Sequence, residues 1–259
     1  MTSSTAEPGA TRCDAFLGGA LLLEQPVRGY RAGMDAVLLA AACPARPGER
    51  VLELGCGAGA AVLALSRRVA GIEAAGLEVQ GKYAALARAN AAGNGLSLEV
   101  VEGDLAAMPE ALRGRSFDHV IANPPFFAAG PSAPDAGRSR ARHETTPLAV
   151  WADAGLRRLR PGGWLTLILP AGRMGSLLAA LEGRGGDARV LPVAPRDGRP
   201  AGRVIVAARK GAKAPLTLLP PLVLHAQAAH LTDGEDLTPA AQAVLRRGAA
   251  LSLAFVQTG

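Results

Sequence analysis

A glycine-rich junction between an apolar strand and a helix constrains this chain more than any other feature. The run Arg50–Leu54 is typical of a buried strand, and Ala58–Val69 has the periodicity of a helix. Gly55, Gly57 and Gly59 lie at the junction, where glycine lets the backbone turn sharply and approach a ligand closely. The junction therefore predicts a strand–loop–helix unit with a ligand site at the carboxyl end of the strand.

Strand-like and helix-like segments alternate over most of the chain after residue 50. Strands separated by helices require right-handed crossovers and a parallel sheet with both faces covered. The last two strands have only a short turn between them, so one of them runs antiparallel. We therefore predict an α/β, Rossmann-like, mostly parallel sheet of about seven strands, with helices on both faces and one antiparallel strand near the C-terminal end. The predicted strands are Arg50–Leu54, Ala74–Val79, Leu98–Val101, Phe117–Ala122, Trp164–Leu169, Ala188–Val193 and Arg203–Ala208.

Composition excludes several other classes of protein. With 259 residues, 49% of them apolar, the chain can bury a large core without disulfides or a metal. Cys13, Cys43 and Cys56 form no CxxC pair, which argues against a zinc site and fits a reducing cytoplasm. No segment approaches the roughly 18–20 apolar residues of a membrane span. We therefore expect a cytoplasmic protein with no metal and no membrane partner, while its oligomeric state stays open.

Positive charge is concentrated in one part of the chain. The net charge is +6, and residues 111–213 hold 17 of the 28 Lys and Arg residues against 7 of the 22 Asp and Glu residues. A concentration of positive charge suits a polyanionic partner, because neutralised phosphates release their counterions. A solvated surface is the alternative interpretation.

The glycine loop alone does not identify its ligand. Gly55, Gly57 and Ala60 also satisfy the dinucleotide pattern G-x-G-x-x-G/A. Glu78, at the end of the second predicted strand, is placed to accept hydrogen bonds from ribose hydroxyls. NAD and S-adenosylmethionine (SAM) both carry such hydroxyls, so Glu78 fits either cofactor.

Two acidic residues favour SAM. Glu53 places an anion directly before the loop, which suits the ammonium group of a methionine moiety and would repel a pyrophosphate. Asp104 follows the third strand, where it can accept a hydrogen bond from an adenine amine. The alternatives are that Glu53 binds local N–H groups and that Asp104 is a helix N-cap.

The tetrapeptide Asn123-Pro124-Pro125-Phe126 follows the fourth strand, at the same edge of the sheet. An exocyclic ring amine is a poor nucleophile, and accepting hydrogen bonds from its N–H groups draws electron density back onto the nitrogen. The Asn123 side-chain oxygen and the carbonyl of Pro124, a residue with a fixed φ, can be those acceptors. Phe126 offers a face on which a flipped base stacks. A proline-rich turn is the alternative.

These motifs resemble two known patterns. The run ELGCGAG with Glu78 and Asp104 resembles the class I SAM-dependent methyltransferases over roughly residues 48–210, and the tetrapeptide resembles the (D/N)PP(Y/F) motif of amino-methyltransferases. The resemblance implies catalysis by Asn123, Pro124, Pro125 and Phe126. It implies cofactor contacts from Tyr30, Asp35, Glu53, Gly55, Cys56, Gly57, Gly59, Glu78, Val79, Asp104, Leu105 and Asn123.

The segment before the first strand narrows the family. Gln25-Pro26 and the run Gly29–Ala40, with the glycine loop and NPPF, are similar to the tRNA adenine N6-methyltransferases that modify the adenosine beside the anticodon of valine tRNA. This implies that tRNA is the partner and that Tyr30 and Asp35 lie against the cofactor. Asp35 as a cap of the following helix is the alternative.

Other functions stay open on the sequence. They are N5-methylation of a protein glutamine, methylation of another RNA base amine, an NAD-dependent dehydrogenase, and an inactive nucleic-acid-binding module. Arg138, Arg140 and Arg142, in the loop 127–144, are candidate phosphate contacts, with solvated loop charge as their alternative.

We expect four segments along the chain. They are a flexible N-terminus (1–13), a hairpin and helix packing on the cofactor site (14–48), the methyltransferase core (49–211) and a C-terminal extension (212–259). Within the extension, Thr238-Pro239 predicts the start of a helix that ends near Arg247.

Overall fold

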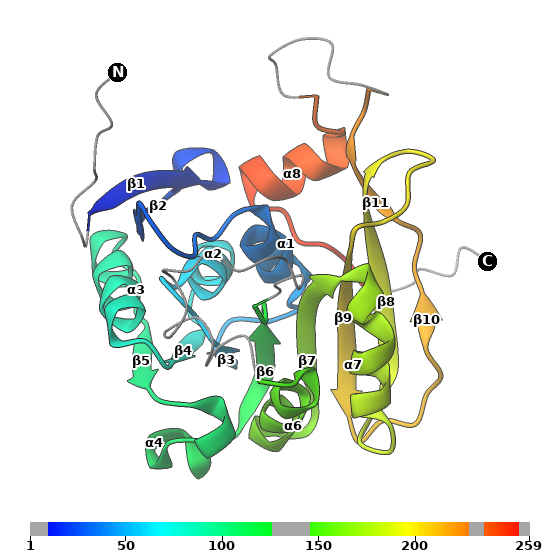
Figure 1. Cartoon of the computed structure of the whole chain (residues 1–259), viewed down its shortest axis with the longest axis horizontal. Helices are drawn as coiled ribbons and strands as arrows, with labels where there is room; N and C mark the ends of the chain where they lie inside the picture. The colour runs from blue at the N-terminus through cyan, green and yellow to red at the C-terminus, as the bar shows by residue number, and fades with distance from the viewer. Residues whose placement is uncertain (1–9, 126–145, 228–235, 254–259) are drawn as a thin grey trace, which may run out of the picture.

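The computed structural model describes residues 10–125, 146–227 and 236–253, and in this part of the chain the strands form a nine-stranded sheet and a separate hairpin (Figure 1). The hairpin consists of β1 (Thr11–Phe16) and β2 (Leu21–Pro26). The strands of the large sheet are β3 (Arg50–Leu54), β4 (Glu73–Glu78), β5 (Glu99–Glu102), β6 (Phe117–Ala122), β7 (Leu159–Pro170), β8 (Gly185–Arg196), β9 (Arg203–Lys210), β10 (Thr217–Leu218) and β11 (Leu222–His225).

The order of the strands places the glycine loop at the centre of the sheet. The neighbours run β5-β4-β3-β6-β7-β9-β8, and β3 pairs in parallel with both β4 and β6. β9 runs antiparallel to both of its neighbours, β7 and β8. The prediction of a mostly parallel sheet with one antiparallel strand near its end is therefore confirmed. The chain changes direction across the sheet between β3 and β6, which is where open α/β sheets bind ligands.

The sheet is larger than predicted, because two short strands extend it at the β8 edge. β10 pairs with β8 near Val190, and β11 pairs with β8 near Val193, both in parallel. They lie in a segment with prolines at 215, 220 and 221, and their lengths of two and four residues are too short for a recognisable alternation.

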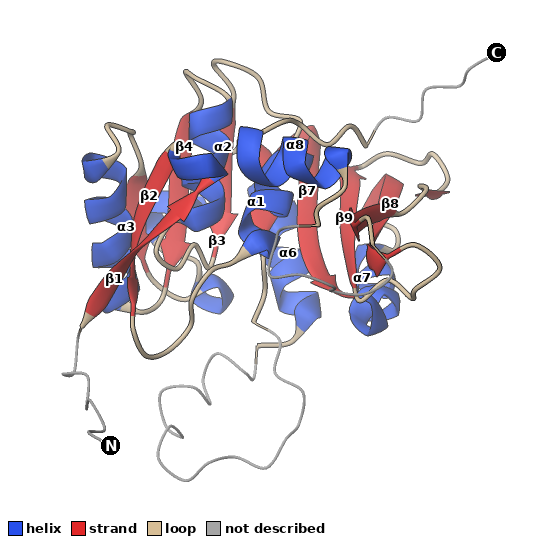
Figure 2. Cartoon of the chain, turned by 90° about the horizontal axis from the view of Figure 1, so that it is seen from above, coloured by secondary structure: helices blue, strands red, loops and turns tan. Residues whose placement is uncertain are grey.

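Helices cover both faces of the sheet. One face carries α1 (Met34–Ala42), α2 (Ala60–Arg68) and α8 (Pro239–Arg247), and the other carries α6 (Leu148–Arg158) and α7 (Met174–Leu181), as Figure 2 shows from above. α3 (Gly81–Gly93) packs against β2 and β5, and α4 (Glu110–Arg113) is a single turn before β6.

α1 lies between the sheet and the outer helices. Residues 36–42 are all buried, and α1 contacts α2, α8 and β7. A helix that is apolar all round is stable only where every side is covered. This helix therefore fixes residues 27–33, which precede it, at the edge of the sheet.

The C-terminal helix lies where the sequence predicts it, whereas the first strand begins earlier than predicted. α8 begins after Thr238, whose hydroxyl oxygen accepts a hydrogen bond from the Ala241 N–H at 3.2 Å, and it ends before Gly248 at φ +67°, so the predicted C-terminal helix is confirmed. β1 begins at Thr11, earlier than the predicted boundary at residue 14, because its polar residues pair with apolar β2. Residues 1–9 lie outside the described residues, so the expectation of a flexible N-terminus stays a prediction, as does the division into segments.

None of the described helices is long and apolar enough to cross a membrane.

Candidate active site

A pocket opens where β3 and β6 end. These strands are neighbours in parallel register, with Leu54 opposite Ala122, so Gly55 and Asn123 leave the sheet side by side. The pocket brings together five of the predicted site residues and seven residues that were not predicted as site residues. The predicted ones are Tyr30, Glu53, Gly55, Cys56 and Asn123, and the others are Gln25, Ala32, Ala36, Ala58, Ala60, Ala61 and Tyr83.

The glycine loop requires glycine for two separate reasons. Gly55, Gly57 and Gly59 have φ angles of +64°, +54° and +87°, in the left-handed region that disfavours side chains. A Cβ at Gly55 would also lie 2.6 Å from the ring of Trp151, which packs under the loop from α6. The Cys56 N–H donates to the carbonyl of Leu77 at 3.0 Å, which fastens the loop to β4.

Glu53 is a buried carboxylate at the base of the pocket. Only 3% of its surface is exposed, and its Oε2 accepts a hydrogen bond from the Val62 N–H at 2.9 Å. Burial raises the pKa of Glu53 to about 8, the Val62 N–H opposes that rise, and the nearby Glu78 adds to it. The predicted alternative, a local N–H partner, is therefore present, and Glu53 lines the pocket as well.

The raised pKa of Glu53 predicts a loss of stability as pH rises. Below pH 8 the native state holds a proton on Glu53 that the unfolded chain releases above its ordinary pKa of about 4.5. The free energy of unfolding should therefore fall between pH 4.5 and pH 8, by at most about 1.4 kcal/mol per pH unit. Glu53→Gln cannot ionise and should lack this dependence. Urea unfolding of both proteins at pH 5 and pH 8 checks this, and parallel profiles would contradict it.

The other acidic residues lie at the ends of β4 and β5. Glu78 is buried, and its two carboxylate oxygens accept from the Gly57 N–H and the Gln80 N–H, each at 2.9 Å. Glu78 thus connects β4 to the glycine loop. Val79, the predicted cofactor contact after Glu78, is exposed.

Asp104 is exposed and is the N-cap of a 3-10 turn that begins at Leu105. Its Oδ1 accepts a hydrogen bond from the Ala106 N–H at 2.9 Å, so the N-cap interpretation holds geometrically. Neither Asp104 nor Leu105 lines the pocket. Their place after β5, next to β4 in the sheet, puts them farther along the same edge.

The tetrapeptide begins directly at the pocket. Asn123 lines it, and its Nδ2 donates to the Tyr30 hydroxyl at 3.3 Å, which leaves Oδ1 as the side-chain acceptor. Pro124 is buried and Pro125 is half-buried. Phe126 lies outside the described residues.

Tyr30 covers the pocket from the segment between β2 and α1. Its own carbonyl accepts a hydrogen bond from the Tyr83 hydroxyl at 3.1 Å, which anchors this segment to α3. About half of the residue is exposed, whereas its hydroxyl points inward at Asn123. Burial of the hydroxyl, with Glu53 and Asp35 nearby, raises the pKa of Tyr30, so the phenol stays neutral.

Asp35 is not among the residues that line the pocket. It lies in the first turn of α1, and its Oδ2 forms an ion pair with the Arg203 Nε at 3.0 Å. The alternative that Asp35 caps the helix is wrong, because the N-cap is Gly33 and no side chain forms a cap hydrogen bond there; an acid in the first turn still suits the positive end of the helix dipole. Asp35 therefore connects α1 to β9 at the edge of the sheet.

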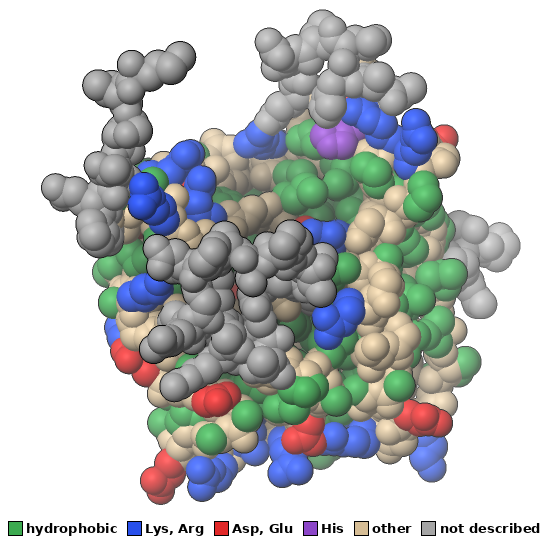
Figure 3. All heavy atoms as spheres, viewed as in Figure 1, with side chains coloured by type: hydrophobic (Ala, Val, Ile, Leu, Met, Phe, Trp, Pro, Cys, Tyr) green, Lys and Arg blue, Asp and Glu red, His purple; other side chains and the backbone are tan. Residues whose placement is uncertain are grey.

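Much of the positive charge in residues 111–213 is paired in the fold. Ion pairs with acidic residues are formed by Arg115, Arg157, Arg160, Arg184, Arg189, Arg196 and Arg203. On the face in Figure 3, Lys and Arg side chains also gather over the N-terminal hairpin. Arg138, Arg140 and Arg142 lie outside the described residues. Among the described residues, no group of three or more His, Cys, Asp or Glu side chains could hold a metal ion.

The strand order, the antiparallel β9 and a glycine loop at the change of direction define the class I SAM-dependent methyltransferase fold. A predicted O-methyltransferase from Agrobacterium tumefaciens shares it with a TM-score of 0.67 and 29% identity, over 84% of this chain and 98% of that one. The 16S rRNA N2 G1207 methyltransferase of Thermus thermophilus shares the fold at 20% identity, with a TM-score of 0.54, over 78% of this chain and 50% of that one.

Sequence comparison identifies the family. Residues 32–169 match the family described as Methyltransferase small domain, and the chain belongs to that family, whose methyl donor is SAM. The chain is 34% identical to a tRNA1(Val) (adenine(37)-N6)-methyltransferase of Porphyromonas gingivalis, over 60% of this chain and 64% of that protein. It is 32% identical to the enzyme of the same name from Tolumonas auensis, over 63% of this chain and 69% of that protein. The chain thus spans just under two thirds of the first of these relatives.

Proposed function

We propose that this protein transfers a methyl group from SAM to the N6 amine of an adenine in tRNA. The observation that carries the proposal is the place of Asn123. Its side chain lines the pocket formed by Glu53 and the glycine loop, directly after β6, the strand next to β3. The names of the relatives that match over most of the core support adenine and tRNA as the acceptor. A tRNA substrate also implies that the reaction takes place in the cytoplasm.

The residues at the pocket fit SAM. Glu53, a buried acid with one N–H partner assigned, suits the ammonium group of the methionine moiety. Gly55, which has no Cβ, leaves its backbone accessible where it lines the pocket. We assign the ribose hydroxyls to Glu78 and the adenine amine to Asp104, because each carboxylate can accept further hydrogen bonds besides those from its backbone N–H partners. Bound SAM supplies an electrophilic methyl group.

The chain's own residues activate and hold the acceptor amine. The Asn123 Oδ1 and the Pro124 carbonyl oxygen accept hydrogen bonds from the two N–H groups of the amine, which increases the electron density on its nitrogen. The Pro124 carbonyl needs no reorganisation, because the ring of proline fixes φ. Phe126 provides the stacking face, worth about 1–3 kcal/mol per base. The methylated amine then loses its proton to water, so the site needs no general base.

A protein glutamine, another RNA base amine and a hydroxyl are the competing acceptors. The glutamine enzymes with the same motif have a helical N-terminal domain, whereas residues 11–26 here form a hairpin. An NAD-dependent dehydrogenase is disfavoured because the family and the named relatives that match this chain are methyltransferases.

Methyl transfer from labelled SAM distinguishes these acceptors. The protein is incubated with unfractionated bacterial tRNA, with ribosomal RNA and with a release factor, and the label in each is counted. The proposal predicts label in tRNA alone. Calorimetric titration with SAM and with NAD separates the dehydrogenase, since only SAM should bind. Label in protein alone, or binding of NAD alone, would contradict the proposal.

Arg138, Arg140 and Arg142 are proposed to contact the tRNA backbone. Replacing all three with Ala should weaken tRNA binding and reduce the slope of log affinity against log salt by about 2–3, because each phosphate contact contributes about 0.7–0.9. Arg115, Arg157 and Arg184 form ion pairs with acids, so replacing them changes the net charge equally and serves as the control. The same slope in both triple variants would exclude phosphate contact by the loop.

A further inference from the structure

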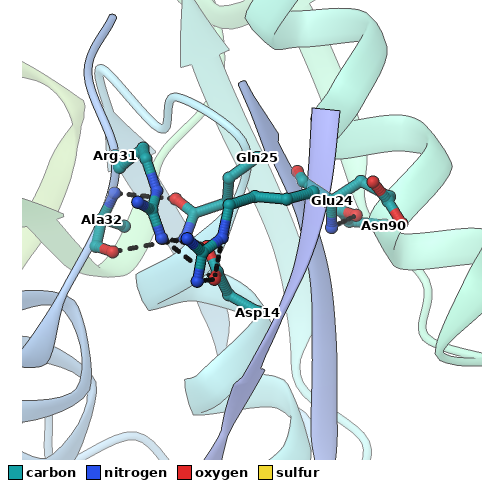
Figure 4. Close-up of polar contacts among 7 residues, drawn as sticks. Asp14, Glu24, Gln25, Arg31, Ala32 and Asn90 are labelled. Atoms are coloured by element: carbon teal, nitrogen blue, oxygen red, sulfur yellow. Dashed lines mark hydrogen bonds and ion pairs between the residues drawn. The ribbon is translucent and has the colours of Figure 1, made fainter. Parts of the chain in front are cut away.

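Asn90 is a buried polar residue inside the alanine-rich helix α3. Only 3% of its surface is exposed, and its amide makes three hydrogen bonds. Oδ1 accepts from the Glu24 N–H at 2.8 Å, and Nδ2 donates to the Glu24 carbonyl at 3.0 Å and to the Ala58 carbonyl at 2.9 Å. Figure 4 shows Asn90 beside Glu24 on β2. One side chain thus joins α3, the N-terminal hairpin and the glycine loop.

Asn94, one turn further along, repeats the contact with the hairpin. Its Oδ1 accepts from the Leu22 N–H at 3.0 Å, and its Nδ2 donates to the Leu22 carbonyl at 2.6 Å. Residues four apart on a helix rise by about 6 Å, and residues two apart on a strand rise by about 6.8 Å, so the spacings match. The two amides therefore pair with the outer edge of β2 as a neighbouring strand would.

The hairpin carries this connection on to Tyr30. Gln25, 1% exposed, accepts from the Ala32 N–H at 2.7 Å and donates to the Ala32 carbonyl at 3.3 Å and to the Asp14 Oδ2 at 2.9 Å. Arg31 donates to both carboxylate oxygens of Asp14. Figure 4 shows Gln25 and Arg31 pointing at Asp14, with Ala32 beside the amide of Gln25. These bonds hold the segment that places Tyr30 against Asn123.

The two asparagines differ in one bond. The Asn94 Nδ2 also donates to the carbonyl of Asn90, one turn earlier in the helix. The Asn90 Nδ2 instead donates to the carbonyl of Ala58, a residue that lines the pocket. The bond to the Ala58 carbonyl fastens the loop to α3, in addition to the bonds that join it to β4 and to the start of α2. Asn90 thus connects the loop to the hairpin, and Asn94 only docks the hairpin.

We propose that Asn90 is a positioning residue for SAM binding, one that makes the N-terminal hairpin a brace between the glycine loop and the segment that carries Tyr30. The inference rests on the proposed function for the identity of the ligand. It gives the hairpin, which the sequence analysis expects at the cofactor site, a specific part in cofactor affinity through the contacts of Asn90.

Asn90→Ala and its matched control Asn94→Ala test this. Each variant loses its two hydrogen bonds to β2, and only Asn90→Ala also loses the hydrogen bond to the Ala58 carbonyl. We expect the Kd for SAM, by calorimetry, and the KM for SAM to rise at least tenfold in Asn90→Ala, with kcat at saturating SAM within threefold of wild type. Asn94→Ala should change both constants less than threefold, although its Tm falls as well. If Asn90 had only a structural role, both variants would have a lower Tm and the same Kd and KM for SAM.

A measurement on the wild-type protein covers the case in which Asn90→Ala does not fold. Hydrogen exchange followed by NMR should show that SAM slows exchange of the Glu24 amide, which is bonded to Asn90 on the side of β2 that faces α3. Unchanged exchange at Glu24, or equal SAM affinity in the two variants, would overturn the inference alone. Failure of wild-type protein to bind SAM would contradict the proposed function first.

Discussion

Replacing Asn123 with Ala should lower kcat about 100- to 1,000-fold while leaving SAM binding within threefold of wild type. The change removes the side-chain acceptor for the substrate amine, and loss of one such preorganised partner typically costs about 10²–10³ in kcat. Asn123 also bonds to the Tyr30 hydroxyl, but Tyr30 keeps its anchor to Tyr83, so the pocket should persist. Initial rates with tRNA and calorimetry with SAM give the two quantities.

Asn123→Asp is the matched control for this prediction. It keeps a side-chain oxygen at the same place and should therefore retain measurable turnover, above that of Asn123→Ala. Full activity of Asn123→Ala would remove this residue from the reaction. Loss of SAM binding with loss of turnover would instead make Asn123 a cofactor contact alone.

Replacing Gly55 with Ala should eliminate SAM binding. The left-handed backbone at φ +64° costs a non-glycine residue roughly 1–2 kcal/mol, and the new Cβ meets the ring of Trp151 at 2.6 Å. Because Trp151 is buried under the loop, the backbone of the loop must shift, and overpacking of this kind costs about 1–3 kcal/mol more. We expect the affinity for SAM to fall at least 100-fold and Tm to fall as well.

Gly93→Ala provides the control. Gly93 is at the end of α3, has no positive φ, and has no atom within 4 Å of an added Cβ. Alanine there should leave SAM affinity unchanged and raise stability by roughly 0.5–1 kcal/mol. A Gly55→Ala protein that binds SAM as tightly as Gly93→Ala would show that the loop tolerates a side chain and is not the cofactor cradle.

The sequence predicts the central fold well because each strand and helix carries its own pattern. Leu54 and Ala122 end short, mostly apolar runs typical of buried strands, and Gly55 follows the first while Asn123 and two prolines follow the second. Parallel order then brings Gly55 and Asn123 together, so the core of the site is predictable from its motifs.

Other parts of the site depend on contacts between distant segments. Nothing near Gln25 in the sequence indicates that its amide pairs with Ala32, and Asn90 and Asn94 look like ordinary helix residues until β2 lies beside them. Their spacing of four is the signal that was present, a polar pair on one face of an otherwise alanine-rich helix. The ion pair of Asp35 with Arg203, a partner 168 residues away, is also invisible in the sequence, and the cofactor contact of Asp35 stays a prediction.

Charge is the least predictable feature from the sequence alone. Residues 111–213 are strongly basic as a segment, yet acids from other segments, such as Glu99 for Arg115 and Asp236 for Arg196, neutralise part of it in the fold. A composition count cannot include such pairing, because it arises only when the strands assemble.

Nucleoside analysis of the methylated product tests the central claim most directly. Unmodified tRNA is treated with labelled SAM and either wild-type protein or Asn123→Ala, then digested to nucleosides and separated. The account predicts label in N6-methyladenosine with the wild-type protein and none with the variant. Label in another nucleoside, or equal N6-methyladenosine from both proteins, would contradict it.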